Sequence, residues 1–271
     1  MKYLLPNVKN ILLVASGKGG VGKTTVAANL AVALARNGHK TGLLDADLFG
    51  PSVPLSLGLE GQRIKAGREE EKEVFEPIER FGIKVISLGF LMNKEDAVIW
   101  RGPMASGALT QLIENTRWGA LDFLVIDMPP GTSDIAITVT QKLPQAKAII
   151  VITPQQVAVA DGRKAAHMFN SNHINIPILG VVENMSYFVP ENHPEEKYLL
   201  FGKGGGQQLA NEVNVPLLAR IPMVSGVCEL GDTGQTVFAS SNKIIVEAFQ
   251  DLSEQIYKKC TEPAWPLKPV F

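Results

Sequence analysis

The sequence predicts a three-layer α/β fold, in which a mostly parallel sheet of about seven or eight strands carries helices on both faces. Three observations lead to this prediction. Short apolar runs alternate with helix-like runs from the start of the chain to its end. The apolar runs are continuous rather than alternating, as expected for strands that are buried on both faces. The 271 residues are 45% hydrophobic and 20% charged, a composition typical of a globular protein with a large core.

The predicted strands are short, continuously apolar runs, and the predicted helices between them have helical apolar spacing. The strands are Ile11–Ala15, Thr41–Asp45, Lys84–Leu88, Phe123–Asp127, Ala148–Thr153, Ile178–Glu183 and Leu217–Ile221. The helices are Thr24–Arg36, Met104–Glu114, Asp134–Lys142, Ala158–Phe169, Gly206–Asn211 and Lys243–Lys258. Two segments are expected to be irregular: the charged stretch Glu60–Arg80, as a solvated excursion, and the loop Met185–Gly206, whose length is typical of functional loops.

We expect a single domain over residues 1–271, with an irregular tail from about residue 259 that contains three prolines. The N-terminus has no signal-peptide pattern, and no apolar run approaches membrane-spanning length. The net charge of −1 creates no overall basic field for nucleic acid or anionic lipid. The two cysteines, Cys228 and Cys260, lie far apart in the sequence and suit a reducing compartment. We therefore expect a cytoplasmic protein that binds neither nucleic acid nor membrane.

The segment from Gly17 to Thr25 carries the strongest chemical signal. It reads Gly-Lys-Gly-Gly-Val-Gly-Lys-Thr-Thr, which has the G-x-x-x-x-G-K-T spacing of the Walker A phosphate loop. The strand before it and the helix after it supply the context that this motif requires, and the start of the helix adds partial positive charge. Lys23 is expected to reach the β- and γ-phosphates, and the Thr24 hydroxyl to hold Mg²⁺. The predicted nucleotide contacts are Gly17, Lys18, Gly19, Gly20, Val21, Gly22, Lys23, Thr24 and Thr25.

An alternative interpretation of the same loop is a dinucleotide fingerprint. Gly17, Gly19 and Gly22 also satisfy G-x-G-x-x-G, and Asp45 lies near the position where that motif expects a carboxylate for a ribose. The Lys-Thr pair that follows has no role in a dinucleotide site, however. We therefore favour the phosphate loop.

Carboxylates at the ends of two further strands complete a Mg²⁺-nucleotide site. Asp127 ends an apolar run, as in a Walker B strand, and is expected to fix Mg²⁺ through water. Asp45 and Asp47 share one side of an extended chain, and we assign Asp45 to the metal shell and Asp47 to the attacking water. The alternative for Asp45 is that it caps a turn. The N–H of Gly131 is expected to meet the γ-phosphate, although its segment also reads as a rigid turn that leads into a helix.

Lys18 gives the loop a more specific resemblance. A phosphate loop with this additional lysine resembles the deviant Walker A motif of the MinD/ParA/ArsA-type ATPases. The resemblance implies that Lys18 crosses a dimer interface to contact the partner's nucleotide as a catalytic charge stabiliser. It also implies a homodimer that closes through the nucleotide face.

Three other segments resemble the Mrp/ApbC/NBP35 branch of this class, over most of the chain. They are Asp45–Ser52, Asp127–Asp134 and Glu183–Phe188. The resemblance implies the P-loop NTPase fold, contact of Asn184 with the adenine edge, a base pocket lined by the segment around Pro222, and work with iron–sulfur scaffold or apo-client proteins. Many members carry a small N-terminal domain, whereas this chain begins almost at its first strand, as a short form or a piece of a longer protein.

The sequence departs from this branch in one respect. Many members carry a C-x-x-C pair shortly after the Asn-Met-Ser segment, and two such pairs would hold a bridging [4Fe–4S] cluster. Here residues 189–196 contain no cysteine, and His193 is the one histidine among them. The resemblance thus implies a cluster whose usual ligands this chain lacks.

The predicted function is a Mg²⁺-dependent, slowly hydrolysing ATPase that serves iron–sulfur cluster assembly or transfer as a dimeric carrier or scaffold. One alternative is a positioning switch of the MinD or ParA kind, which would bind membrane, DNA or a partner protein. The proline-broken tail and the net charge argue against the membrane and DNA forms of that alternative. A small-molecule kinase or ligase is a third alternative, for which we find no second-substrate motif.

Overall fold

The computed structural model describes residues 4–47, 50, 52–69, 72–91 and 102–261. Within these residues an eight-stranded sheet has the order β11-β9-β8-β1-β7-β2-β6-β5. Neighbouring strands are parallel except for β5 and β6, which are antiparallel. The strands are β1 (Val8–Ala15), β2 (Thr41–Asp45), β5 (Ile78–Arg80), β6 (Ile83–Ser87), β7 (Leu121–Asp127), β8 (Lys147–Ile152), β9 (Ile178–Glu183) and β11 (Leu217–Arg220).

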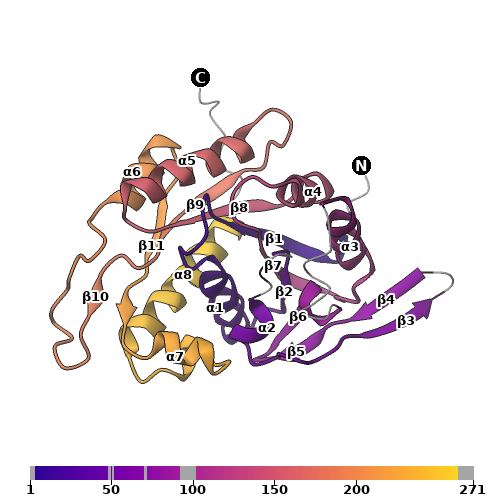
Figure 1. The fold of residues 1–271 in the computed structure, drawn as a ribbon, viewed down its shortest axis with the longest axis horizontal. Helices are drawn as coiled ribbons and strands as arrows, with labels where there is room; N and C mark the ends of the chain where they lie inside the picture. Colours follow the sequence, from indigo (N-terminus) through magenta and orange to yellow (C-terminus); the bar gives the residue numbers. More distant parts are fainter. Residues whose placement is uncertain (1–3, 48–49, 51, 70–71, 92–101, 262–271) are drawn as a thin grey trace.

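Helices cover both faces of the sheet, which confirms the predicted three-layer fold (Figure 1). Helices α1 (Lys23–Arg36) and α8 (Lys243–Thr261) pack together on one face. The other face carries α3 (Gly102–Asn115), α4 (Asp134–Lys142), α5 (Gln156–Asn170) and α6 (Gly205–Glu212). The central strands are buried almost completely, because an apolar strand between two helical layers has no face in contact with water. Helix α8 extends two residues past the predicted start of the tail, and residues 262–271 lie outside the described part.

The prediction of an irregular excursion over Glu60–Arg80 is wrong for most of its length. Strands β3 (Lys65–Glu69) and β4 (Lys72–Glu76) pair as an antiparallel hairpin, and β5 joins the edge of the main sheet. The charged composition suits edge elements, because their outward faces meet water. Phe75 of β4 is buried and supplies the apolar anchor of this segment.

The described residues also form several short elements. They are helices α2 (Val53–Ser56) and α7 (Val227–Asp232), the 3₁₀ helices Leu88–Phe90 and Val237–Ala239, and the paired strands β10 (Phe188–Val189) and β12 (Met223–Val224). Among the described residues, no helix combines the length and the apolar character needed to span a bilayer. The carboxyl ends of β1, β7 and β2 lie side by side, since Val14 pairs with Asp127 and Asp127 pairs with Asp45. Ligands of open parallel sheets bind at this edge.

Candidate functional site

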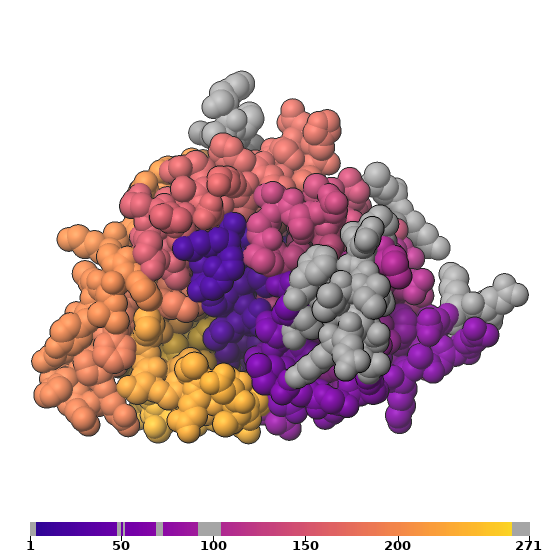
Figure 2. Space-filling model, viewed as in Figure 1, coloured from indigo at the N-terminus to yellow at the C-terminus, as the bar shows by residue number. Residues whose placement is uncertain are grey.

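The phosphate loop lies between β1 and α1, and a cavity of about 440 Å³ and another of about 260 Å³ open beside it. Figure 2 shows the N-terminal segment that contains the loop reaching the surface near the middle of one face. The smaller cavity is lined by the predicted residues Lys18, Gly19, Gly20, Gly22, Lys23, Thr24, Thr25 and Asp47. Gly22 has φ of 79°, a left-handed conformation that favours glycine, and α1 begins directly after it with no side-chain cap. The uncapped N–H groups of α1 make this cavity suited to an anion.

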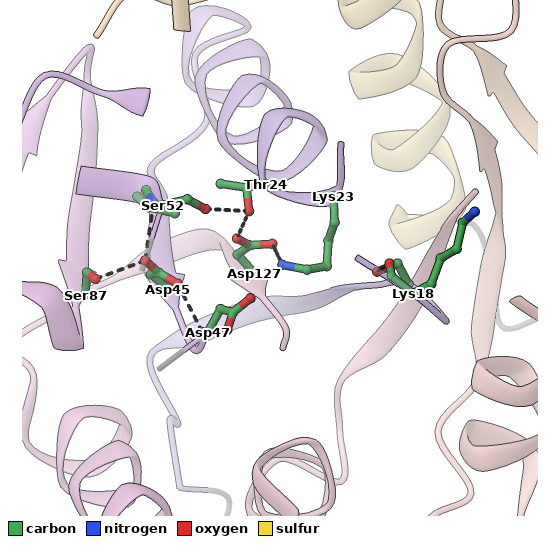
Figure 3. Close-up of polar contacts among 10 residues, drawn as sticks. Lys18, Lys23, Thr24, Asp45, Asp47, Ser52, Ser87 and Asp127 are labelled. Atoms are coloured by element: carbon green, nitrogen blue, oxygen red, sulfur yellow. Dashed lines mark hydrogen bonds and ion pairs between the residues drawn. The ribbon is translucent and has the colours of Figure 1, made fainter. Parts of the chain in front are cut away.

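Lys23 and Thr24 both bind the carboxylate of Asp127 (Figure 3). The Lys23 Nζ lies 2.5 Å from Asp127 Oδ1, and the Thr24 hydroxyl donates to Oδ2 at 2.6 Å. Asp127 is fully buried, and burial raises its pKa while the Lys23 ammonium lowers it. The sequence places these residues more than 100 positions apart, and the parallel pairing of β1 with β7 brings them together.

Asp45 lies beside Asp127 but directs both of its oxygens to donors of the protein. It accepts hydrogen bonds from Asp47 N at 3.1 Å, from the Ser87 hydroxyl at 3.0 Å and from Val53 N at 3.4 Å. Burial, followed by the negative charge of Asp127, raises the pKa of Asp45 to about 8. These contacts match the alternative in which Asp45 caps a turn, because they fix both ends of the segment from Asp47 to Val53. Asp47 itself lines the phosphate-loop cavity.

Other predicted residues have structural partners within the protein. Gly17 packs against the backbone of Asp161 in α5. The Gly131 N–H donates to Ser16 O at 2.9 Å, so contact with a γ-phosphate requires that bond to open. Lys18 lines the phosphate-loop cavity, and Figure 3 shows its side chain pointing away from the Lys23–Asp127 pair. Within the described residues, the Lys18 ammonium has no ion-pair partner.

Asn184 and Pro222 both line the larger cavity, which is mostly apolar and shares Thr24, Thr25 and Ser52 with the smaller one. A purine base needs such an apolar slot next to the phosphate loop. The Asn184 side chain also donates to Val21 O at 2.8 Å, and a Cβ on Gly22 would lie 2.2 Å from its Nδ2 atom. Asn184 therefore holds the phosphate loop in place and lines the larger cavity at the same time.

Sequence reasoning missed the roles of two polar residues, Ser52 in the site and Glu183 next to Asn184. Ser52 donates to Thr24 Oγ1 at 2.9 Å. Glu183 is buried at the end of β9, where it accepts from the Ser186 hydroxyl at 2.6 Å and from Gly206 N at 2.5 Å, with Arg220 Nε 3.7 Å away. A carboxylate that ends an apolar strand is the sequence signal that could have identified Glu183. It fixes both ends of the long loop that follows Asn184.

Replacing Glu183 tests this anchoring role. We expect Glu183→Ala to lower the free energy of unfolding by about 3 kcal/mol, because the buried Gly206 N–H loses its acceptor. Glu183→Gln keeps an acceptor and the side-chain shape, and should cost about 1 kcal/mol. Urea unfolding of both variants measures the difference. If the two variants lost equal amounts of unfolding free energy, the hydrogen bonds of Glu183 would not be the source of its contribution to stability.

The donors at this edge of the sheet fit Mg²⁺ and do not fit an iron–sulfur cluster. Hydroxyl and carboxylate oxygens of Thr24, Ser52 and Asp127 form the hard donor set that Mg²⁺ prefers. Clusters need thiolates. Among the described residues, one group of three or more candidate metal-binding side chains lies close together. It is exposed, consists of His193, Glu195 and Glu196, and contains no cysteine.

The fold and the site together define a P-loop nucleotide-binding protein: a phosphate loop between β1 and α1, a Walker B carboxylate on the neighbouring strand, and a base-sized cavity beside them. The chain belongs to the family described as NUBPL iron-transfer P-loop NTPase, whose model matches residues 7–257. This finding confirms the resemblance noted from the sequence.

Known relatives agree with this assignment. An "Iron-sulfur cluster carrier protein" from Synechocystis sp. is 47% identical over 95% of this chain and 72% of its own length. An Arabidopsis thaliana "Iron-sulfur protein required for NADH dehydrogenase, mitochondrial" is 43% identical over 95% of this chain and 81% of its own.

Among solved structures, the nucleotide-binding protein from Archaeoglobus fulgidus in complex with ADP superposes with a TM-score of 0.76 and 37% identity. The match covers 90% of this chain and 93% of that one. The cell division ATPase MinD from Pyrococcus furiosus gives a TM-score of 0.67 at 23% identity, over 92% and 99% of the two chains, and this likeness shows the fold alone.

Proposed function

We propose that this protein binds Mg²⁺·ATP, hydrolyses it slowly, and uses the nucleotide state to serve iron–sulfur cluster assembly or transfer. One observation carries the nucleotide part: Lys23 and Thr24 converge on the buried carboxylate of Asp127 at the wall of the phosphate-loop cavity. A phosphate can replace Asp127 as the partner of the Lys23 ammonium, because carboxylate and phosphate oxygens both accept charge-assisted hydrogen bonds. An A. fulgidus structural relative in complex with ADP supports the proposal.

The residues of the chain divide the work as follows. Lys23 leaves Asp127 and contacts the β- and γ-phosphates, which become its new charge partners. The N–H groups of the loop and of α1 hold the phosphates, and Asp47 orients the attacking water. Thr24, and Asp127 through water, would hold Mg²⁺, which would neutralise phosphate charge when bound. Asp45 accepts hydrogen bonds from the N–H groups of Asp47 and Val53 and so holds the backbone of the water-orienting residue Asp47.

Lys18 supports a nucleotide-bridged homodimer as part of this proposal. Lys18 lines the phosphate-loop cavity, its side chain points away from Asp127, and its ammonium has no ion-pair partner among the described residues. A cation without an ion-pair partner beside a phosphate site suits charge stabilisation, and its outward direction suits a nucleotide on a second copy of the chain. The partners of that dimer would be iron–sulfur scaffold or client proteins, in keeping with relatives that are iron–sulfur carrier proteins.

We expect the isolated protein to hold an iron–sulfur cluster weakly or not at all. Cys228 is exposed on α7 and Cys260 is partly buried near the end of α8, and burial raises the pKa of the Cys260 thiol. Neither cysteine belongs to a group of candidate metal-binding side chains, so the described residues contain no set of thiolates that could hold a cluster. Anaerobic reconstitution, followed by iron and sulfide analysis, measures this. The Synechocystis sp. carrier, reconstituted in parallel, serves as the reference. Stoichiometric iron and sulfide with the visible absorption of a cluster would contradict the expectation.

A further inference from the structure

Ser52 lies in the site, although no motif or neighbouring residue in the sequence predicts a contact there. Its hydroxyl lies 2.9 Å from Thr24 Oγ1, although the two residues are 28 positions apart. Ser52 also lines both cavities, which places it where the phosphate and base ends of the site meet. Figure 3 shows Ser52, Thr24 and Asp127 in a row of linked oxygens.

The backbone around Ser52 is fixed by contacts that do not involve its hydroxyl. Val53 N donates to the buried Asp45 carboxylate at 3.4 Å, and Ser56 N donates to Ser52 O at 3.0 Å in the first turn of α2. Asp45 is held in turn by the Ser87 hydroxyl. The side-chain oxygen of Ser52 is therefore placed by the fold, and within the described residues its hydrogen-bond partner is the Thr24 oxygen that is expected to hold Mg²⁺.

The separation of the two hydroxyls matches the geometry of a magnesium ion. Mg²⁺ binds oxygens at 2.0–2.1 Å in a near-ideal octahedron, so neighbouring ligand oxygens lie about 2.9 Å apart. Thr24 Oγ1 directs its proton toward Asp127 and accepts from Ser52, which leaves one lone pair for a cation. A neutral serine hydroxyl is a ligand of the same kind, and Ser52 needs no backbone movement to sit beside Thr24.

We propose that Ser52 is a second hydroxyl ligand of the nucleotide's Mg²⁺, next to Thr24. This inference rests on the proposed Mg²⁺·ATP function and adds a ligand from the segment between β2 and α2. Ser52 leads directly into α2, and α2 packs against α7 at the wall of the larger cavity. A contact between Ser52 and the metal would therefore connect this wall to the metal site.

The test measures the metal dependence of nucleotide binding rather than turnover. A fluorescent ADP analogue is titrated into wild type, Ser52→Ala and the remote control Ser171→Ala, in EDTA and over a series of Mg²⁺ concentrations. For Ser52→Ala we expect the Mg²⁺ concentration that gives half of the maximal increase in ADP binding to rise by about 10-fold or more. Losses of metal affinity of this size are typical when a residue that supports a metal site is removed. Binding in EDTA should stay as in wild type, and so should Ser171→Ala under both conditions.

A thiol at this position distinguishes a ligand from a hydrogen-bond donor. Ser52→Cys should favour Cd²⁺ over Mg²⁺ more strongly than wild type, which carries the same two native thiols, because a sulfur ligand selects softer ions. Thermal unfolding of each variant without nucleotide verifies the fold. An unchanged Mg²⁺ requirement in Ser52→Ala, an equal loss of ADP affinity with and without metal, or an unchanged Cd²⁺ preference in Ser52→Cys overturns the inference. Wild type that shows no Mg²⁺-dependent nucleotide binding would instead overturn the proposed function.

Discussion

Replacing Lys23 by alanine is expected to abolish ATP hydrolysis and to weaken nucleotide binding beyond ready detection. The ammonium of Lys23 is the group placed to neutralise the β- and γ-phosphates, and loss of one preorganised charge donor in such a site costs a factor of about 100–1,000 or more in rate. Phosphate release measures the rate, and equilibrium dialysis with ATP measures binding. Turnover equal to wild type in Lys23→Ala would falsify the assignment of the phosphate loop.

The same substitution also affects folding, because Lys23 pairs with a carboxylate that is fully buried. Removing one partner of a buried pair costs about 3–5 kcal/mol, an upper value here since the Thr24 hydroxyl still donates to Asp127. The double variant Lys23→Met with Asp127→Asn removes both charges and keeps similar volumes. We expect it to recover stability in urea unfolding and to stay inactive. Recovery of stability without recovery of binding separates the role of Lys23 at the phosphates from its role in the core.

Gly17→Ala is expected to displace the phosphate loop and to destabilise the protein strongly. A Cβ at Gly17 would lie 1.9 Å from the backbone oxygen of Asp161 and 2.7 Å from the nitrogen of Gly162, both in α5. Backbone atoms of a packed helix cannot rotate away as a side chain can, so the loop or the helix must move. We expect a loss of about 3 kcal/mol in the free energy of unfolding. ATP affinity should fall with it, because the loop N–H groups lose their alignment.

The matched control lies two residues away in the same loop. A Cβ at Gly19 would have no atom within 4 Å, and Gly19 does not have a left-handed backbone conformation. Gly19→Ala should therefore leave the stability of the nucleotide-free protein within about 0.5 kcal/mol of wild type. Urea unfolding without nucleotide compares the two variants. Similar stabilities for Gly17→Ala and Gly19→Ala would show that the approach of α5 to the loop does not constrain residue 17.

The central elements were predictable because their local signals are strong. Strands β2 and β9 have the predicted bounds, and the other central strands differ by one to three residues at their ends. Continuous burial on both faces leaves a run of apolar residues that no polar alternation interrupts. The edge hairpin of β3 and β4 was missed since its charged residues face water and resemble a loop in the sequence. Helices α2 and α7 were missed because four to six residues carry too little periodicity to detect.

The residues of the candidate site likewise include some that could be predicted from the sequence and some that could not. We could predict the phosphate loop, the Walker B carboxylate and the family from the sequence, because these depend on residue types at fixed local spacing. The three-dimensional packing was needed to show that Asp45 directs its oxygens to Asp47, Val53 and Ser87, and that the Ser52 hydroxyl donates to Thr24. Such contacts join different strands and loops at one edge of the sheet. Their geometry depends on how the whole chain packs, which no local pattern of residues encodes.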